Sequence, residues 1–201
     1  MIPDSITLFP GQFTSVSLEC VNWPSFSYCP EVKASLSFDD SSVRIRFDVA
    51  EDHVLATETS DNHPVCVDSC VEAFIMTADG RNYINFECNP LGTLLAARRA
   101  TRKEKSPLCP EKLALVRRRG SHVGASPFEL RQSGGCPQLW WLEMEIPFSL
   151  LGYTGRPDSL RFNLYKCGDR TDRPHYLSLF PVLSDKPDFH RPEYFGDMLF
   201  C

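Results

Sequence analysis

Short stretches in which apolar and polar residues alternate, separated by turn-forming residues, recur along the whole chain. The clearest runs from Val43 to Val49, where apolar residues at every second position alternate with charged ones. A strand with one face in an apolar core produces this period of two. The pattern predicts an all-β protein, an antiparallel β-sandwich of jelly-roll or Greek-key type with roughly nine or ten strands.

Further strands are predicted from alternation and from the residues that end them. Asp79-Gly80 is a strong hairpin signal, and it predicts paired strands on either side. A single helical turn is expected from Phe148 to Gly152, and one more short helix near residues 110–119. The remaining predicted strands are Cys70–Thr77, Asn82–Asn89, Leu139–Ile146, Leu160–Lys166 and Asp197–Phe200.

Composition indicates one folded domain over residues 1–201. The hydrophobic fraction of 42% provides enough apolar material for a core. The net charge of −5 is too small to attract nucleic acid or a membrane surface. It has no apolar run long enough to span a bilayer, and its start, Met1-Ile2-Pro3-Asp4, lacks the features of a secretory signal. We therefore expect a cytoplasmic protein with no membrane or nucleic-acid partner.

Nine cysteines are unevenly spaced, and an odd number argues against a closed disulfide framework. We expect most of them to be small, buried and reduced.

Polar side chains line one side of three predicted strands. Positions two apart on a strand share a face, so Glu72 faces the same way as Cys70, and Asn85 the same way as Glu87. Carboxyl and amide groups match the donors and acceptors of sugar hydroxyls, and an aromatic ring can cover the C–H face of a pyranose. An ordinary solvated sheet face would show the same alternation. The polar rows comprise Glu72, Tyr83, Asn85, Glu87, Asn89, Arg161, Asn163 and Tyr165.

Several motifs follow one another in order along the chain. They are Asp68-Ser69-Cys70-Val71-Glu72, Tyr83-Ile84-Asn85-Phe86-Glu87, Trp141–Pro147, residues 165–169 through 174–176, and residues 187–196. Together these motifs resemble the family 9 carbohydrate-binding modules, and more closely their compact bacterial relatives. The resemblance extends over about residues 35–200, with residues 1–34 expected as an extension packed on the sandwich.

The resemblance implies a β-sandwich that holds the end of a glycan between two aromatic rings. Glu72 matches the glutamate of the family, and the first ring usually stands six residues before it, where this chain has Cys66. Phe180 and Phe189 are the candidates for the second ring. A missing ring weakens stacking by about 1–3 kcal/mol. Family members also bind structural calcium, but no EF-type run of ligands is present, so no metal or other cofactor is assigned.

These observations predict a non-catalytic module rather than an enzyme, with an oligo- or polysaccharide as its partner. The sequence does not determine the oligomeric state. The expected binding residues are Glu72, Tyr83, Asn85, Glu87, Asn163, Tyr165, Phe180 and Phe189.

Two other functions remain open. Glu72 and Glu87 could be neighbours across two strands, as the carboxyl pair of a glycoside hydrolase or of its accessory domain would be. An open sheet face, however, is not expected to raise the pKa of either carboxyl group. A sandwich that has lost its sugar and serves as an interaction domain is the third class, given Cys66.

Three further chemistries are less consistent with the spacing. The site of a thiol hydrolase could be formed by Cys167, Asp169 and His175, which lie close together in the sequence. Cys66, Cys70 and a histidine could bind zinc, but they lack paired short spacings. Two basic runs, residues 98–105 and 117–119, could bind a polyanion, but they lack interleaved aromatic residues and are expected at solvated sheet edges.

Overall fold

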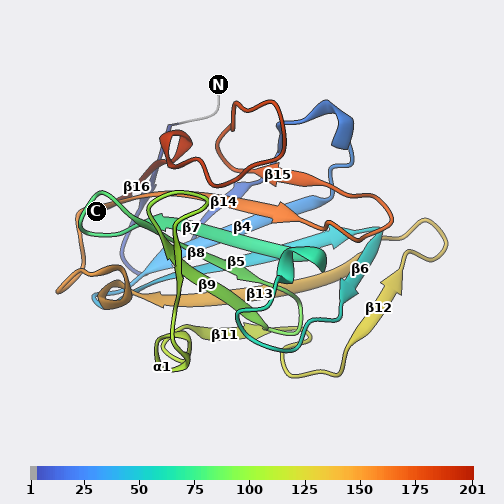
Figure 1. Ribbon diagram of the computed structural model, residues 1–201, viewed down its shortest axis with the longest axis horizontal. Coiled ribbons are helices and arrows are strands. Elements are labelled where there is room, and N and C mark those ends of the chain that lie inside the picture. Colours follow the sequence, from blue (N-terminus) through green and yellow to red (C-terminus); the bar gives the residue numbers. More distant parts are fainter. Residues whose placement is uncertain (1–3) are drawn as a thin grey trace.

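The computed structural model describes residues 4–201, and within this range sixteen strands form two main sheets packed face to face and one two-stranded ribbon (Figure 1). The strands are β1 (Ser5–Leu8), β2 (Thr14–Ser17), β3 (Cys20–Val21), β4 (Glu31–Phe38), β5 (Ser42–Glu51), β6 (His53–Ala56), β7 (Cys70–Met76), β8 (Tyr83–Cys88), β9 (Leu94–Arg99), β10 (Lys105–Pro107), β11 (Arg117–Gly120), β12 (Phe128–Arg131), β13 (Gln138–Pro147), β14 (Ser159–Cys167), β15 (Tyr176–Ser178) and β16 (Gly196–Phe200). The helical elements are η1 (Pro24–Phe26), η2 (Val65–Val67), α1 (Pro110–Leu113), η3 (Phe148–Leu151) and η4 (Pro192–Tyr194).

The large sheet has the strand order β1-β16-β14-β7-β8-β9-β10, with β15 paired to β14 and β3 paired to β15. The small sheet has the order β11-β13-β5-β4-β2, and β6 pairs with β12 in a separate ribbon. All pairs are antiparallel except β1 with β16. The predicted all-β antiparallel sandwich is confirmed.

The strand count exceeds the predicted nine or ten because several strands have only two to four residues, too few for alternation to be recognised. The helix expected near residues 110–119 is confined to α1, and Arg117–Gly120 is instead the edge strand β11. The helical turn η3 ends as predicted at Gly152, whose φ of 90° suits a residue without a Cβ.

The small sheet follows the alternation that predicted it. On β5, Val43, Ile45, Phe47 and Val49 are buried in the main core, and the charged residues between them point outward. β13 pairs with β5 over ten residues, from Gln138 opposite Glu51 to Pro147 opposite Ser42. This sheet therefore has one buried and one solvated face, which is the arrangement that a two-residue period records.

The large sheet is covered on both faces. Its inner face, including Ile75, Ile84 and Phe86, packs in the main core. Its outer face carries a second apolar cluster, in which Trp23 and Phe189 cover residues of the strands. In Figure 1 the red loops between β15 and β16 and the blue segment around η1 lie over β14. β7 and β8 are consequently buried at almost every position.

The N-terminal region, expected as an extension over residues 1–34, contributes strands to both sheets. β1 joins the large sheet beside β16, and β2 joins the small sheet beside β4. β3 pairs with β15, which itself pairs with β14, so β3 also belongs to the large sheet. Residues 1–3 lie outside the described part of the chain.

Among the residues that the structure describes, no helix has the length and apolar character that crossing a bilayer requires.

Candidate functional site

A pocket of about 250 Å³ lies on the outer face of the large sheet, where the covering segments leave the strands accessible. β7, β8 and β14 supply its floor. Its walls come from η2, the loop between β9 and β10, β15, and the segments that follow β14 and β15. Its lining consists of Cys66, Glu72, Phe74, Glu87, Arg102, Cys167, Asp169, Tyr176, Pro187, Asp188, Phe189 and His190.

Two carboxyl groups form the centre of the floor. Glu72 of β7 lies directly opposite Glu87 of β8 in the strand register, and opposite Tyr165 of β14 on its other side. The hairpin between β7 and β8 turns at Asp79-Gly80, where the Asp79 carboxylate accepts hydrogen bonds from the backbone N–H groups of Arg81 and Asn82. This turn sets the register, so both glutamates project from the outer face, as the alternation predicts.

Burial makes both carboxyl groups weak acids. Glu72 is 3% exposed and Glu87 is 6% exposed. Burial and then the nearby Glu87 raise the pKa of Glu72 well above its usual range. Burial also raises the pKa of Glu87 to about 7, although the Arg99 guanidinium and the Asn85 amide oppose the change. The sequence expectation that nothing raises the pKa of either carboxyl group is wrong, because the sheet face is covered rather than open.

Asn85 lies beside Glu87 on the outer face of β8 and does not line the pocket. Its amide nitrogen donates to Glu87 Oε1 at 2.8 Å, and its Oδ1 accepts a hydrogen bond from Arg99 Nε at 2.7 Å. Arg99 is itself buried. The hydrogen bonds from Arg99 to Asn85 and from Asn85 to Glu87 therefore link the Glu87 carboxyl group to the buried Arg99 guanidinium and orient it.

The tyrosines of the outer face hold the covering segment in place. The Tyr83 hydroxyl lies 3.0 Å from His190 Nδ1, and the Tyr165 hydroxyl donates to the Phe189 carbonyl at 3.2 Å. The ring of Tyr165 stacks on that of Phe189 at 4.2 Å between centroids. Both tyrosines are completely buried beneath the pocket wall.

The two-ring clamp implied by the family resemblance is not formed by the predicted residues. Phe189 lines the pocket, but one face of its ring already packs on Tyr165. Cys66 also lines the pocket, at the position of the usual first ring. Tyr176, which is partly exposed, is a further ring in the wall.

Phe180 and Asn163 lie outside the pocket lining. The Phe180 ring packs on Phe162 in the main core at 5.5 Å between centroids. Asn163 uses its amide to bind the backbone of Phe180, donating to the carbonyl at 3.1 Å and accepting from the N–H at 3.0 Å. The structure therefore gives Asn163 a role in anchoring the chain after β15, and it removes Phe180 as a sugar-facing ring.

Several pocket residues were not predicted as ligands. Arg102 belongs to the first basic run, and its guanidinium lies 3.5 Å from Asp188 Oδ1. His190 packs on Phe74, and burial lowers its pKa to about 3, so it is neutral at physiological pH. Asp188 and His190 belong to residues 187–196, one of the motifs that resemble family 9, so that motif could have indicated them. Arg102 lies in a loop, where no sequence pattern indicates a binding residue.

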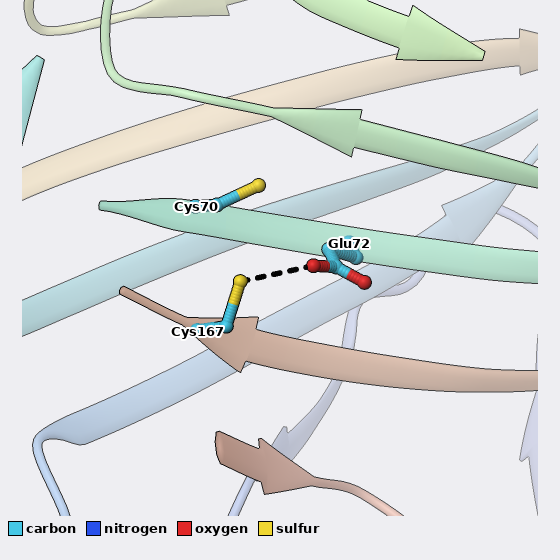
Figure 2. A group of neighbouring side chains, drawn as sticks. All are labelled: Cys70, Glu72 and Cys167. Atoms are coloured by element: carbon cyan, nitrogen blue, oxygen red, sulfur yellow. Dashed lines mark hydrogen bonds between the residues drawn. The ribbon is translucent and has the colours of Figure 1, made fainter. Parts of the chain in front are cut away.

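Figure 2 shows three side chains at one end of the pocket floor. The Cys167 thiol donates to Glu72 Oε1 at 3.1 Å, and Cys70 lies opposite Cys167 in the strand register. The hydrogen bond with Cys70, together with burial, raises the pKa of the Cys167 thiol well above its usual range. A thiol this weakly acidic is a poor nucleophile at neutral pH.

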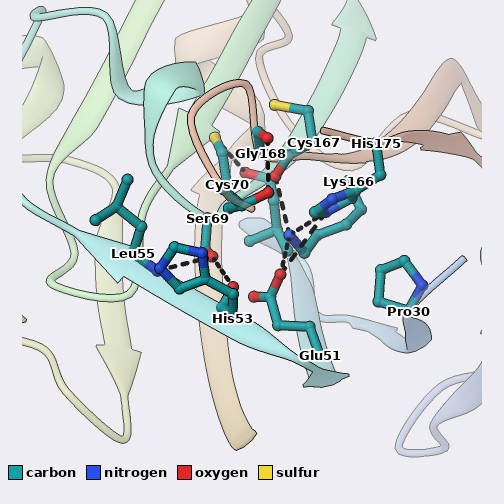
Figure 3. A network of polar contacts seen from close by, with 12 residues as sticks. Pro30, Glu51, His53, Leu55, Ser69, Cys70, Lys166, Cys167, Gly168 and His175 are labelled. Carbon is teal, nitrogen blue, oxygen red and sulfur yellow. Dashed lines mark hydrogen bonds and ion pairs between the residues drawn. The ribbon is translucent and has the colours of Figure 1, made fainter. Parts of the chain in front are cut away.

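The structure separates Cys167 from His175. His175 Nε2 lies 2.8 Å from Lys166 Nζ, which forms an ion pair with Glu51 at 2.9 Å (Figure 3). Because Lys166 and Cys167 are adjacent on β14, their side chains point to opposite faces of the large sheet. The Cys167–His175 pair of a thiol hydrolase is therefore not assembled.

The basic runs lie mainly at sheet edges. β11, with Arg117 and Arg119, is the edge of the small sheet, and β10 is the edge of the large sheet. Arg117 and Arg119 lie 3.5 Å and 3.8 Å from the carboxylates of Glu145 and Glu143 on β13. Charged side chains on an edge discourage pairing with another sheet.

Comparison with known proteins relates the chain to sugar-binding sandwiches. The sequence model of the family described as carbohydrate-binding family 9 matches residues 6–200. A candidate carbohydrate-binding protein from Bacteroides uniformis ATCC 8492 has a crystal structure that is similar with a TM-score of 0.90 and 28% identity, covering 98% of each chain.

Two structures of a family 9 module from Caldicellulosiruptor kristjanssonii share the fold. The complex with glucose has a TM-score of 0.60 and 12% identity, covering 98% of this chain and 95% of the other. The complex with cellotriose has a TM-score of 0.58 and 11% identity, covering 98% and 93%.

A curated mouse relative, the UPF0462 protein C4orf33 homolog, is 30% identical over 140 residues. The match covers 65% of this chain and 60% of the length of the mouse protein.

Proposed function

Because the chain belongs to carbohydrate-binding family 9, we propose that its pocket holds the terminal unit of an oligo- or polysaccharide without cleaving it. Membership supports a carbohydrate-binding module with a β-sandwich fold rather than an enzyme. The single observation that carries the placement of the sugar is the pair of opposed carboxyl groups, Glu72 and Glu87, in the floor of a pocket walled by polar and aromatic side chains.

The size of the pocket favours one sugar ring over a longer segment. Its volume of about 250 Å³ is below the roughly 300–1,000 Å³ of sites for drug-sized ligands. The covering segments close the pocket on their side, so the rest of a glycan chain would leave through the open side into solvent. The ligand is therefore proposed to bind by its end.

The lining provides the hydrogen-bonding groups that a sugar requires. A protonated carboxyl group both donates and accepts, so Glu72 and Glu87 can serve hydroxyls in either sense. Asp188 and Arg102 add an acceptor and a donor at the wall. The partly exposed ring of Tyr176 is available for the C–H face of the sugar. It would replace the aromatic ring that family members usually have at the position of Cys66.

Gluco-oligosaccharides are the first ligands to test, since the two modules of the same fold from Caldicellulosiruptor kristjanssonii were solved with glucose and with cellotriose. Calorimetric titration with glucose, cellotriose and a wider glycan panel identifies the ligand class.

Glu72→Gln tests the pocket directly. The variant keeps the size of the side chain but replaces its carboxyl group with an amide. Affinity for the glycan is expected to fall about ten- to a hundred-fold, which corresponds to the loss of a hydrogen bond worth about 1.5–3 kcal/mol. Glu143→Gln, on the outer face of the small sheet, is the matched control and should bind as the wild type does.

Two results would contradict the placement. Wild-type affinity in Glu72→Gln with the ligand still bound would move the sugar elsewhere. Flat responses across the whole glycan panel would favour an interaction domain that has lost its sugar.

Hydrolysis remains the alternative to binding, and the geometry of Glu72 and Glu87 keeps it testable. A glycosidase needs one protonated and one ionised carboxyl group, whereas burial raises the pKa of Glu87 to about 7 and that of Glu72 well above its usual range, so both are protonated below pH 7. We therefore expect no turnover of a chromogenic glycoside panel between pH 5 and pH 6. Turnover that Glu72→Gln and Glu87→Gln both remove would replace the binding proposal with an enzymatic one.

A further inference from the structure

Three potential metal ligands converge at one end of the pocket floor. The sulfur atoms of Cys70 and Cys167 and a carboxylate oxygen of Glu72 all lie within 4.8 Å of one another, and all three residues are buried (Figure 2). Among residues 4–201 this is the one group of three or more His, Cys, Asp or Glu side chains that meets at such distances.

The strands themselves determine this convergence. Cys70 and Cys167 are directly opposite in the antiparallel pairing of β7 and β14. Glu72 is two residues after Cys70 on the same strand, so it projects from the same face. Because both faces of the large sheet are covered, the backbone that carries the three ligands is rigid, and only side-chain rotamers need to adjust.

The chemistry of the group matches a thiophilic cation. Zinc binds cysteine sulfur at about 2.3 Å and carboxylate oxygen at about 2.0–2.2 Å, and tetrahedral ligand atoms then lie about 3.3–3.8 Å apart. Cys167 Sγ and Glu72 Oε1 lie 3.1 Å apart, and all three atoms lie within 4.8 Å of one another. Calcium prefers six to eight oxygen ligands, so a set that contains two sulfur atoms does not fit it.

The surroundings favour a cation and leave one side of the group open. Glu72 and Cys167 line the pocket, whereas Cys70 lies behind them, so an ion can enter from the pocket side. Glu87 and Asp169 line the same pocket and add negative charge when ionised. Three protein ligands with an open fourth position are the arrangement of an accessible zinc site.

We propose that Cys70, Glu72 and Cys167 bind a divalent cation of the zinc class, with its fourth coordination position facing the pocket. The site differs from the set considered from the sequence, since it uses Cys167 and a carboxylate in place of Cys66 and a histidine. It does not depend on the binding of a sugar, and its test uses metal alone.

Cobalt serves as the spectroscopic probe. The four exposed cysteines are first replaced by serine in the full chain, which leaves the internal thiols as the only sulfur ligands; these positions are Cys29, Cys109, Cys136 and Cys201. Titration with Co²⁺ under a phosphine reductant is expected to give the sulfur-to-cobalt charge-transfer band and the visible bands of tetrahedral Co²⁺ at one equivalent, and Zn²⁺ should displace them.

Variants in the same background assign the ligands. Cys70→Ser and Cys167→Ser should each remove most of the charge-transfer intensity, and Glu72→Gln should weaken Co²⁺ binding at least ten-fold. Cys66→Ser, in the same pocket but outside the group, is the matched control and should retain the spectrum. Loss of the band in Cys66→Ser with retention in Cys167→Ser would overturn the assignment.

Melting curves keep the test independent of how well the variants fold. Zn²⁺ should raise the melting temperature of the wild-type chain and leave that of Cys167→Ser unchanged. The proposal is overturned if the wild type gives neither a cobalt spectrum nor a zinc-dependent rise in melting temperature. It is also overturned if peptide mapping finds a Cys70–Cys167 disulfide in protein isolated without reductant. Glycan affinity enters none of these measurements, so their failure would leave the sugar proposal standing.

Discussion

At the scale of single residues, the Glu87 carboxyl group shows how tertiary burial changes the chemistry of a side chain. Its own strand would leave it on an open face, where its acidity would be ordinary. Covered by the segment that carries His190, it is 6% exposed, and burial raises its pKa to about 7. Arg99 and Asn85 reduce the effect but do not cancel it. The carboxyl group is therefore protonated, and able to donate a hydrogen bond, below about pH 7.

This pKa makes folding stability depend on pH. A carboxyl group that is a weaker acid in the folded state binds more protons there, so its contribution is fully present below pH 4.5 and is lost as the pH rises through about 7. A pKa raised from 4.5 to about 7 corresponds to on the order of 3 kcal/mol. Glu87→Gln, which mimics the neutral form, should gain stability relative to the wild type between pH 5 and pH 8.

Denaturant unfolding of both proteins at pH 5, 6, 7 and 8 measures the difference. Glu145→Gln, on the outer face of the small sheet, is the control and should follow the wild type at every pH. Parallel curves for Glu87→Gln and the wild type would show that Glu87 titrates in the fold as it does in the unfolded chain.

At the scale of the element, β14 serves both faces of the large sheet. Leu160, Phe162 and Leu164 enter the main core, and Tyr165 and Cys167 face the outer layer. Near its end, Lys166 turns inward and meets Glu51 of the small sheet at 2.9 Å, with no exposed side-chain surface on either residue (Figure 3). The Trp140 indole N–H donates to the same carboxylate at 2.6 Å, and His175 lies against Lys166. This buried network joins the two sheets.

Lys166→Met should destabilise the fold by about 3–5 kcal/mol, because it leaves the Glu51 carboxylate buried without its cation. The double variant Lys166→Met with Glu51→Gln should recover part of that loss, since the glutamine amide keeps an acceptor for Trp140 without a charge. A double-mutant cycle by denaturant unfolding measures the coupling. Lys33→Met, which removes the exposed pair with Glu31, should leave stability close to that of the wild type, because solvent screens a pair on the surface. Additive effects of the two buried substitutions would contradict the network.

At the scale of the whole molecule, the pocket exists because segments far apart in sequence cover the large sheet together. The Trp23 indole N–H donates to the Ser184 carbonyl at 2.8 Å, across 161 residues of chain. Its ring packs on Tyr176 and Phe189, at 6.1 Å and 5.7 Å between centroids. The N-terminal region thus supports the wall of the proposed sugar site from outside.

Trp23→Ala should lower the free energy of unfolding by about 3–5 kcal/mol and also weaken glycan binding, because Tyr176 and Phe189 lose their support. Trp141→Ala is the matched control: this ring lies on the small sheet under the Arg46 guanidinium, 4.1 Å away, and its loss should cost about 1 kcal/mol without changing affinity. Unfolding by denaturant and calorimetric titration measure the two effects. Unchanged affinity in folded Trp23→Ala would show that the wall holds its shape without this contact.

The sequence alone determined the class of fold and the direction of the key side chains. Alternation on β5, the Asp79-Gly80 turn and the glycine that ends η3 are local features, so they could be recognised without knowing their partners. The same period of two placed Glu72 and Asn85 on one face of one sheet. Sugar binding at these residues stays a prediction, since parity alone fixes where side chains point and not what they contact.

Only the tertiary structure decided that this face is covered, and with it the pocket. The chain from Gly168 to Phe195 has little regular secondary structure, so no period in its sequence reveals its path. Its position depends on long-range contacts, such as Trp23 with Phe189 and Asn163 with the Phe180 backbone. Such contacts place His190 at the site and Phe180 in the core, and the ion pair with Asp188 holds Arg102 against the same segment. Local patterns follow from the geometry of a single strand, whereas a pocket follows from the packing of many segments at once.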